Sequence, residues 1–320
     1  MEKSTETKLM SLRKAYGEAL VELGKENQDI VALDADLGKS TMSIFFKEAF
    51  PDRYFEMGIA EQNMASVSAG LALSGKIPFY STFAVFASGR AYDQIRCSIA
   101  IPELNVRICG SSCGLSDFGD GKTHQSVEDA NIMRAMPNMT VLNPVDAVET
   151  KKMMKAVLSH QGPVYIRINR NDLPVYTSAD NEYQIGKVYP ITEGSDVVIF
   201  ATGVMVSKSV EAAAKLKIEG ISAQVVNVST LKPLLMDEFI KYAVGKKAIV
   251  TAEEAVKTGG LGDTIAALLF NEVKVPLVQV AIDDLFGTSS HYYEELLVKY
   301  GLSTNDVYNA VKDALKRSKI

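Results

Sequence analysis

Short hydrophobic runs alternate along this chain with longer segments in which apolar residues recur at helical spacing. The runs have the length of buried strands, and the periodic segments are long enough for helices. This alternation predicts parallel α/β architecture. In the first half, the expected helices are 9–24, 59–74, 84–100, 126–135 and 146–160, and the expected strands are 29–34, 76–82, 105–110, 139–143 and 163–169.

A second set of the same kind follows a polar, irregular stretch at residues 171–195. We place the domain boundary in this stretch and predict two three-layer α/β domains with mainly parallel sheets, residues 1–182 and 183–320. A length of 320 residues suits two domains. In the second domain the expected strands are 196–201, 223–228, 247–251 and 277–282, and the expected helices are 204–218, 236–244, 262–271, 291–300 and 303–317.

Composition excludes several classes of protein. The chain is 47 % hydrophobic and 23 % charged, with a net charge of −5 and no lysine or arginine cluster, so we expect no nucleic-acid partner. It has no run of roughly 20 apolar residues and no apolar signal-peptide core, so we expect no membrane partner. Three cysteines cannot all pair within one chain, which predicts a reduced, cytoplasmic protein. The CxxxC pair has no companion ligands, so no metal site is expected there.

Two motifs resemble nucleotide-binding signatures but lack the required spacing. "GKST" at 38–41 resembles the end of a P-loop, but that motif needs a glycine where Leu33 stands. "TGGLGD" at 258–263 lacks the GxGxxG spacing of a dinucleotide fingerprint, and we interpret it as a helix N-terminal turn.

The stretch "FEMGIAEQNM" places Glu61 just ahead of a run of small residues, ASVSAGLALSG at 65–75, that predicts a buried helix. A carboxylate at this position either caps the helix or takes part in chemistry. In a dry pocket the charged form is disfavoured, and the side chain can hold a proton near neutrality. The helix N-terminus acts in the opposite direction, because it favours the anion.

Four stretches, the first of which contains Glu61, decide between these interpretations. "MGIAEQNM", "GKIPFYSTFAVFASGRAYDQIR", "FGDGKTHQSVEDANIMRAMPNMTVLNPVDAVE" and "RINRNDLPVY" occur in this order, and together they resemble the pyrimidine-binding domain of transketolase. The ending "LFGTSSHYYEELLVKYGLS" resembles the C-terminal domain of the same family. Full-length transketolases carry an additional, N-terminal diphosphate-binding domain. The resemblance therefore implies the C-terminal subunit of a split transketolase.

The resemblance implies an activity and a cofactor. Transketolases move a two-carbon ketol unit from a ketose phosphate to an aldose phosphate, here as part of the pentose phosphate pathway, and use thiamine diphosphate for the carbon chemistry. Glu61 matches the acid that hydrogen-bonds the cofactor's pyrimidine ring and so allows the ring to act as a base. The implied catalytic residues are Glu61 and His124, and the implied cofactor-binding residues are Asp36, Glu61, Phe83 and Phe86.

The substrate side is implied in the same way. Phosphate-binding positions of the family match Arg13, Ser40 and Arg170, and sugar-binding positions match Asp120 and His124. The sequence departs from several transketolases at Ser112, where they have a histidine, so phosphate affinity or substrate preference could differ. Arg90 faces substrate or forms an ion pair; the sequence does not decide between these.

The resemblance also implies what other chains must supply. The "GDG" at 119–121 is followed by Asn143 near the spacing of a metal–diphosphate motif, but the pattern between them differs, so we expect no metal ligands in this chain. Mg²⁺ or another divalent cation, together with the diphosphate, would be bound by a separate N-terminal subunit. We expect an α2β2 heterotetramer and an inactive isolated chain. The alternatives are a 1-deoxy-D-xylulose-5-phosphate synthase-like enzyme, the beta subunit of a 2-oxo acid dehydrogenase decarboxylase component, and a non-enzymatic scaffold subunit.

Overall fold

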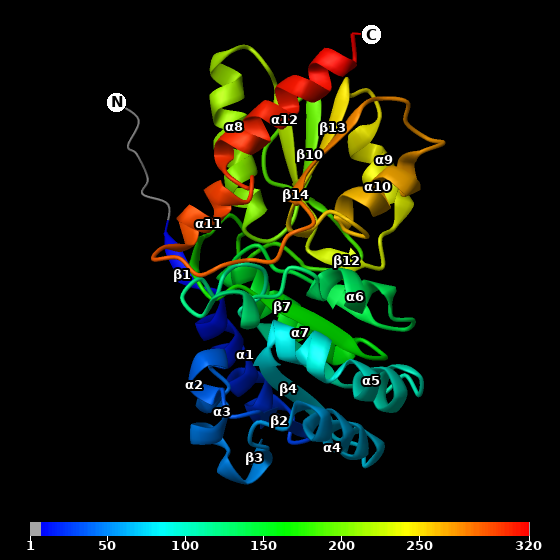
Figure 1. Cartoon of the computed structure of the whole chain (residues 1–320). Coiled ribbons are helices and arrows are strands. Elements are labelled where there is room, and N and C mark those ends of the chain that lie inside the picture. Colours follow the sequence, from blue (N-terminus) through cyan, green and yellow to red (C-terminus); the bar gives the residue numbers. More distant parts are fainter. Residues whose placement is uncertain (1–7, 320) are drawn as a thin grey trace.

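The computed structural model of the chain describes residues 8–319. Its two halves lie one above the other in Figure 1, and each is a β-sheet between layers of helices. The predicted fold of two three-layer α/β units with mainly parallel sheets is confirmed. No helix among residues 8–319 is long and apolar enough to cross a bilayer.

The lower unit of Figure 1 is built on a seven-stranded sheet. Its strands are β2 (Ile30–Asp34), β3 (Tyr54–Glu56), β4 (Ile77–Phe83), β5 (Arg107–Ser111), β6 (Thr140–Leu142), β7 (Val164–Ile168) and β12 (Thr230–Lys232). Their order across the sheet is β12-β6-β7-β5-β4-β2-β3, and every neighbouring pair is parallel except β12 with β6. A separate antiparallel pair joins β1 (Leu9–Ser11) to β8 (Asp172–Pro174).

Alternate residues of these strands pack on opposite faces of the sheet. Ile30 and Ala32 belong to a cluster with α1 (Leu12–Glu26), while Val31 and Leu33 belong to a cluster with α4 (Glu61–Leu73). Because both faces are covered, the strands are continuous hydrophobic runs. The other helical segments of this unit are α2 (Gly38–Thr41), α3 (Ile44–Ala49), η1 (Pro51–Arg53), η2 (Phe86–Arg90), α5 (Tyr92–Gln94), η3 (Ile95–Ala100), η4 (Gly121–Thr123), α6 (Asp129–Ala135) and α7 (Ala147–Ser159).

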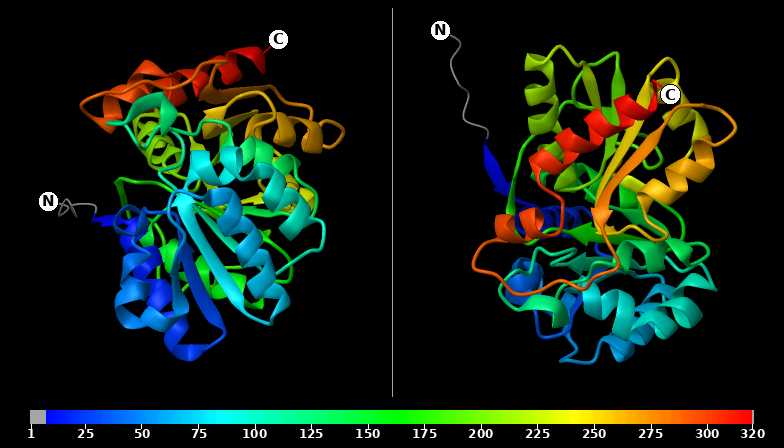
Figure 2. Two further views of the ribbon diagram at one scale, coloured as in Figure 1. Left: turned by 60° about the horizontal axis from the view of Figure 1, so that its bottom comes forward. Right: turned by 45° about the horizontal axis from the view of Figure 1, so that its top comes forward.

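The upper unit has a five-stranded sheet, shown from two further directions in Figure 2. Its strands are β9 (Tyr189–Pro190), β10 (Val197–Ala201), β11 (Ala223–Asn227), β13 (Ala248–Val256) and β14 (Leu277–Ile282). The order is β14-β13-β10-β11-β9, with β9 antiparallel to β11 and the other pairs parallel. The helices are α8 (Met205–Ile218), α9 (Met236–Ala243), α10 (Leu261–Leu269), α11 (Tyr293–Lys299) and α12 (Thr304–Arg317).

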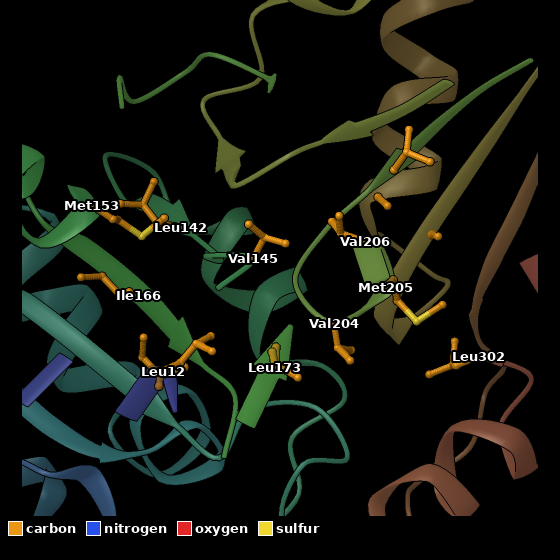
Figure 3. Packing of buried hydrophobic residues seen from close by; sticks show 14 of the residues in the cluster. Leu12, Leu142, Val145, Met153, Ile166, Leu173, Val204, Met205, Val206 and Leu302 are labelled. Atoms are coloured by element: carbon orange, nitrogen blue, oxygen red, sulfur yellow. The ribbon is translucent and has the colours of Figure 1, made fainter. Parts of the chain in front are cut away.

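The two units share a sheet edge and a hydrophobic core. Strand β12 comes from the second half of the chain but pairs with β6 of the first unit. Buried side chains such as Leu142, Ile166, Met205 and Leu302 belong to one continuous cluster that includes residues of both units, as Figure 3 shows. This shared core fixes the second unit against the carboxyl ends of the first unit's strands.

The structure differs from the sequence expectations in the loops and at element ends. Residues 35–58, expected as a loop, hold α2, α3, η1 and β3, which are too short to produce a clear periodicity. The helix expected over 84–100 is broken into α5 and two π-helical segments, η2 and η3. The helix expected from residue 126 begins at Asp129, and the start of the one expected from residue 9 is strand β1.

Hydrogen bonds define the starts of two helices, and the second of these starts was predicted from the sequence. Asp146 caps α7 and accepts from the Glu149 backbone N–H at 2.8 Å. The Glu149 carboxylate accepts from the Val145 N–H at 2.7 Å, one residue earlier than in a standard capping box. The turn at "TGGLGD" is the N-terminus of α10, where the Glu253 carboxylate accepts from the Leu261 and Gly262 N–H groups.

Candidate active site

Most of the candidate residues converge at the carboxyl edge of the parallel strands in the first unit. Asp36 follows β2, Phe83 ends β4, the loop containing His124 follows β5, and Arg170 follows β7. In open parallel sheets this edge is where ligands bind, because the loops that follow the strands can reach one another there. Residues far apart in the sequence therefore meet in one region.

Glu61 is the first residue of α4, and its side chain is almost completely buried, with 1 % exposed. Its carboxylate does not cap the helix. Nη1 of Arg90 lies 2.8 Å from each of the two Glu61 carboxylate oxygens, so the side chain is held in an ion pair. The structure thus resolves the choice left open for Arg90 in favour of an ion pair, and this cation lies at the pocket in which the Glu61 carboxylate is buried.

A pocket of about 390 Å³ opens beside Glu61. Phe86 forms one wall, and its ring is stacked on that of Phe83 with an interplanar angle of 13° and a centroid separation of 6.1 Å. The His124 ring meets the Phe86 ring edge-on at 5.5 Å. The pocket therefore joins a carboxylate, an aromatic wall and an imidazole; it is lined by Ala35, Asp36, Leu37, Ile59, Glu61, Phe86, Arg90, Thr123 and His124.

The loop after β2 is anchored by Asp34, a residue that the sequence analysis did not single out. The Asp34 carboxylate accepts from the Leu37 N–H at 2.6 Å and from the Thr41 and Ser43 hydroxyls at 2.8 Å. Burial raises the pKa of Asp34 to about 6. These bonds fold the loop back on the strand end and leave Asp36 exposed at the pocket, with a left-handed backbone (φ 62°).

Arg13, Ser40 and Arg170 lie together. Arg13 Nε donates to the Arg170 carbonyl oxygen at 3.0 Å, and Arg13 Nη1 donates to the Ser40 carbonyl oxygen at 2.8 Å. Burial and then the nearby Arg170 cation lower the pKa of Arg13. The two arginines thus bring two cationic groups into one region, which suits an anion.

Arg170 also connects to the loop that contains His124. Arg170 Nη1 donates to Asp117 Oδ2 at 3.0 Å, and its guanidinium lies 5.8 Å from the centroid of Phe83. Burial raises the pKa of Asp117 against the opposing effect of Arg170, and Asp120 adds to the rise. Asp120 itself is exposed at the start of η4.

Hydrogen bonds to main-chain groups of the second unit help to hold this loop in place. Gln125 Nε2 donates to the Asp117 carbonyl at 3.2 Å and to the Thr288 carbonyl at 3.0 Å, across the boundary between the units. The Phe118 carbonyl accepts from the Ser290 N–H at 2.8 Å. Within the loop, Ser112 is fully buried and has a left-handed backbone (φ 54°).

The family of the chain follows from comparison with known proteins. The sequence model for the transketolase pyrimidine-binding domain matches residues 8–175, and the one for the transketolase C-terminal domain matches residues 186–307. The chain belongs to the transketolase family. This confirms the family expected from the sequence motifs.

Relatives of this transketolase-family chain include proteins of the same length. A protein of Methanocaldococcus jannaschii, provisionally named as a transketolase C-terminal section, is 41 % identical over 96 % of both chains. The 6-deoxy-6-sulfo-D-fructose transketolase subunit of Clostridium sp. is 40 % identical over 96 % of this chain and 95 % of that protein. The transketolase of Rattus norvegicus is 36 % identical, and only 49 % of its length is covered.

Solved structures agree with the fold. A split-gene transketolase in an inactive β4 tetramer superposes with a TM-score of 0.87 at 47 % identity, over 97 % of this chain and 99 % of that chain. The transketolase of Campylobacter jejuni superposes with a TM-score of 0.80 at 22 % identity, over 98 % of this chain and 48 % of that one. The second match shows the shared fold alone.

Family membership implies thiamine diphosphate, and the pocket residues fit one end of this cofactor. A flat aminopyrimidine needs a hydrogen-bonding acid at its edge and an aromatic surface against its face, and Glu61 and Phe86 present these two features to one pocket. Among residues 8–319, no three His, Cys, Asp or Glu side chains are arranged to hold a metal ion.

Some residues that shape the site were not found by sequence reasoning. Asp117 and Gln125 contribute through hydrogen bonds between segments distant in sequence, whereas Asp34 binds the loop that directly follows its own strand. For Asp34 a signal existed, since an aspartate ending a hydrophobic strand is well placed to bind the backbone of the following turn. For Gln125 there was none, because its partner Thr288 is in the other unit.

Proposed function

We propose that this chain is the C-terminal subunit of a two-chain, thiamine diphosphate-dependent transketolase that transfers a two-carbon ketol unit between sugar phosphates. The observation that carries the proposal is the pocket in which the buried Glu61 carboxylate, the Phe86 wall and His124 meet. The same-length relatives named as transketolase subunits support it. When bound, the cofactor supplies the carbon nucleophile and stabilises the electron pair left on the transferred unit.

Each pocket residue has a defined task in this proposal. Glu61 hydrogen-bonds the edge of the pyrimidine ring and holds or gives up a proton there. Phe86, backed by Phe83, supports the face of the ring. Asp36 lines the same pocket and would contact the cofactor there.

The remaining residues would bind the sugar phosphate. Arg13 and Arg170 would bind the phosphate oxygens, with Ser40 beside them. His124 and Asp120 would contact the sugar hydroxyls, and His124 would move protons near the reacting carbons because it lines the pocket beside Glu61. The half-exposed position of His124 leaves its ring accessible to a substrate.

A partner subunit would complete the site. Ile59 lines the pocket and is 74 % exposed, and Leu73 at the other end of α4 is also 74 % exposed. Ile59 therefore gives the pocket an exposed apolar rim, which would be covered by another chain. We propose an N-terminal subunit of roughly 250–300 residues, on the usual domain-size scale, that binds the diphosphate and a divalent cation such as Mg²⁺, in an α2β2 complex.

Reconstitution tests the proposal. The chain is purified alone and with the candidate partner encoded beside it, in the presence of thiamine diphosphate and Mg²⁺. The complex should transfer ketol units from a ketose phosphate to an aldose phosphate, and the isolated chain should not. Decarboxylation of pyruvate by the complex, with no ketol transfer, would overturn the proposal in favour of a 2-oxo acid enzyme.

The sugar specificity of the complex is tested with a panel of donor substrates. The pentose phosphate pathway is the proposed setting, but relatives named for 6-deoxy-6-sulfo-D-fructose and for apulose 4-phosphate indicate that subunits of this kind serve different sugars. Xylulose 5-phosphate, sulfofructose and apulose 4-phosphate should therefore be compared as donors. The highest kcat/KM with a pentulose phosphate would support the proposed setting.

A further inference from the structure

Arg90 makes two contacts in the pocket at the same time. Its Nη1 atom lies 2.8 Å from both oxygens of the Glu61 carboxylate, and its guanidinium carbon lies 4.3 Å from the centroid of the Phe86 ring. A flat, cationic group thus donates to the acid while it lies over the aromatic wall. These are the two contacts that the proposed function assigns to the pyrimidine ring of the cofactor.

The chemical likeness explains why one group can replace the other. A guanidinium is planar, carries N–H donors at its edge and stacks on aromatic faces. An aminopyrimidine is also planar and meets a carboxylic acid with a nitrogen at its edge. We infer that Arg90 is a positioning residue: in the cofactor-free chain it takes the place of the pyrimidine ring and aligns Glu61, and it must move aside when the cofactor binds. This inference rests on the proposed function.

The difference in burial between Glu61 and Arg90 explains both why the ion pair forms and how Arg90 can move away from it. The Glu61 side chain is 1 % exposed, and a buried carboxylate without a partner is costly. The Arg90 side chain is 42 % exposed, so it can turn into solvent without unfolding its surroundings. An ion pair with one solvated partner is weak enough to be exchanged for another donor. Rotamer changes of exposed side chains take only picoseconds to nanoseconds.

The local backbone aims the side chain. Arg90 ends the π-helical segment η2, which begins at Phe86. A π-helical turn rotates the residues that follow relative to a regular α-helix, and such turns are frequent at functional sites. Phe86, which would face the pyrimidine ring, and Arg90, which takes the place of that ring, therefore come from one short segment.

Binding of the ring alone tests the inference without any catalysis. The probe is the neutral aminopyrimidine alcohol that remains when the thiazolium and diphosphate are removed from the cofactor. Its affinity for the isolated full-length chain is measured by ligand-observed NMR for the wild type and for Arg90→Met, Arg90→Lys and Glu61→Ala. Arg96→Met is the matched control, because Arg96 is exposed and does not line the pocket.

Removal of the Arg90 guanidinium, which competes with the pyrimidine ring for Glu61, should strengthen binding of the ring. Arg90→Met should bind the ring roughly two- to fivefold more tightly than the wild type, the range expected for loss of a half-exposed ion pair. Arg90→Lys should lie between them, because it keeps the charge but lacks the planar fork. Added salt should strengthen binding to the wild type and leave Arg90→Met unchanged. Arg96→Met should match the wild type.

The outcomes separate the two proposals. If the wild type binds the ring, Glu61→Ala abolishes binding, and Arg90→Met binds no better than the wild type, the inference about Arg90 is wrong and the proposed function stands. If neither the wild type nor Arg90→Met binds the ring, or if Glu61→Ala binds as well as the wild type, the pyrimidine site itself is misassigned and both proposals fail. Circular dichroism of each variant checks that the fold is retained.

Discussion

Glu61 is the residue on which the proposed chemistry depends. In the reconstituted complex, Glu61→Ala should lower kcat by about 10²–10⁴-fold, the usual contribution of a group that handles a proton in the transition state. The fold should persist, because the substitution frees Arg90, whose side chain is already partly solvated. Steady-state kinetics and a thermal melt of each protein test this. Glu48→Ala, which removes an exposed carboxylate on α3, is the control; a rate near that of the wild type for Glu61→Ala would contradict the assignment.

At the residue scale, the resemblance to transketolases implied that Glu61, Phe86, His124 and Asp36 belong to one site, and the structure gathers these four around one pocket. The contact between Arg90 and Glu61 could not be predicted. This contact depends on the direction of the Arg90 side chain at the end of a π-helical turn. The change from an α-helical to a π-helical turn adds one residue per turn, and the hydrophobic pattern of the sequence does not reveal it.

At the scale of elements, the loop after β2 owes its shape to Asp34. Asp34→Ala would leave the Thr41 and Ser43 hydroxyls and the Leu37 N–H without their acceptor. Because such charge-assisted bonds each contribute appreciably when buried, the free energy of unfolding should fall by about 2–4 kcal/mol. Urea denaturation of the isolated chain measures this change.

The neighbouring Asp36 offers the matched control for that prediction. It is exposed and has a left-handed backbone, which asparagine tolerates as well as aspartate does. Asp36→Asn should therefore leave the urea midpoint within experimental error of the wild type. An Asp34→Ala midpoint equally close to the wild type would show that the loop does not depend on the carboxylate.

Some elements of the fold could be predicted from the sequence pattern, and others could not. Long amphipathic or strongly hydrophobic segments such as α1, α7 and β10 follow from their periodicity, because each buries one defined face. Strand β12 could not be placed, since three residues carry no period and its partner β6 is about ninety positions away in the chain. Helices α2 and α3 are likewise set by tertiary contacts rather than by pattern.

At the scale of the whole molecule, the second unit supports the loop that contains His124. Gly287 packs against Gln125, and a Cβ at Gly287 would lie 1.9 Å from Gln125 Oε1 and 2.8 Å from Leu115 Cδ2. Gly287→Ala should therefore displace Gln125 and loosen the loop. In the reconstituted complex, KM for sugar phosphate should rise and kcat should fall, while the affinity of the isolated chain for the pyrimidine ring stays unchanged.

Gly119→Ala is the control for that experiment, because Gly119 lies in the same loop and a Cβ there meets no atom within 4 Å. This variant should keep the kinetics of the wild type. If Gly287→Ala also keeps them, the second unit does not position the loop. A general loss of stability would instead appear as a lower melting temperature together with weaker binding of the ring.

The junction between the units also contains Glu254, a buried carboxylate whose charge state depends on pH. It accepts from the Leu115 N–H at 2.9 Å and from the Tyr293 hydroxyl at 2.7 Å, and burial raises its pKa from 4.5 to about 7. Between these two pKa values the folded chain binds more protons than the unfolded chain. Its stability should therefore fall as the pH rises through this interval and level off above about pH 7.

Glu254→Gln isolates this contribution, because glutamine cannot titrate but keeps an oxygen that accepts from Tyr293 and Leu115. Urea midpoints measured from about pH 5 to about pH 8 should fall less for the variant than for the wild type. Glu149, which is also buried and has a pKa of about 7, contributes the same slope to both proteins and cancels in the difference. Parallel curves for the two proteins would mean that Glu254 does not link protonation to the contact between the units.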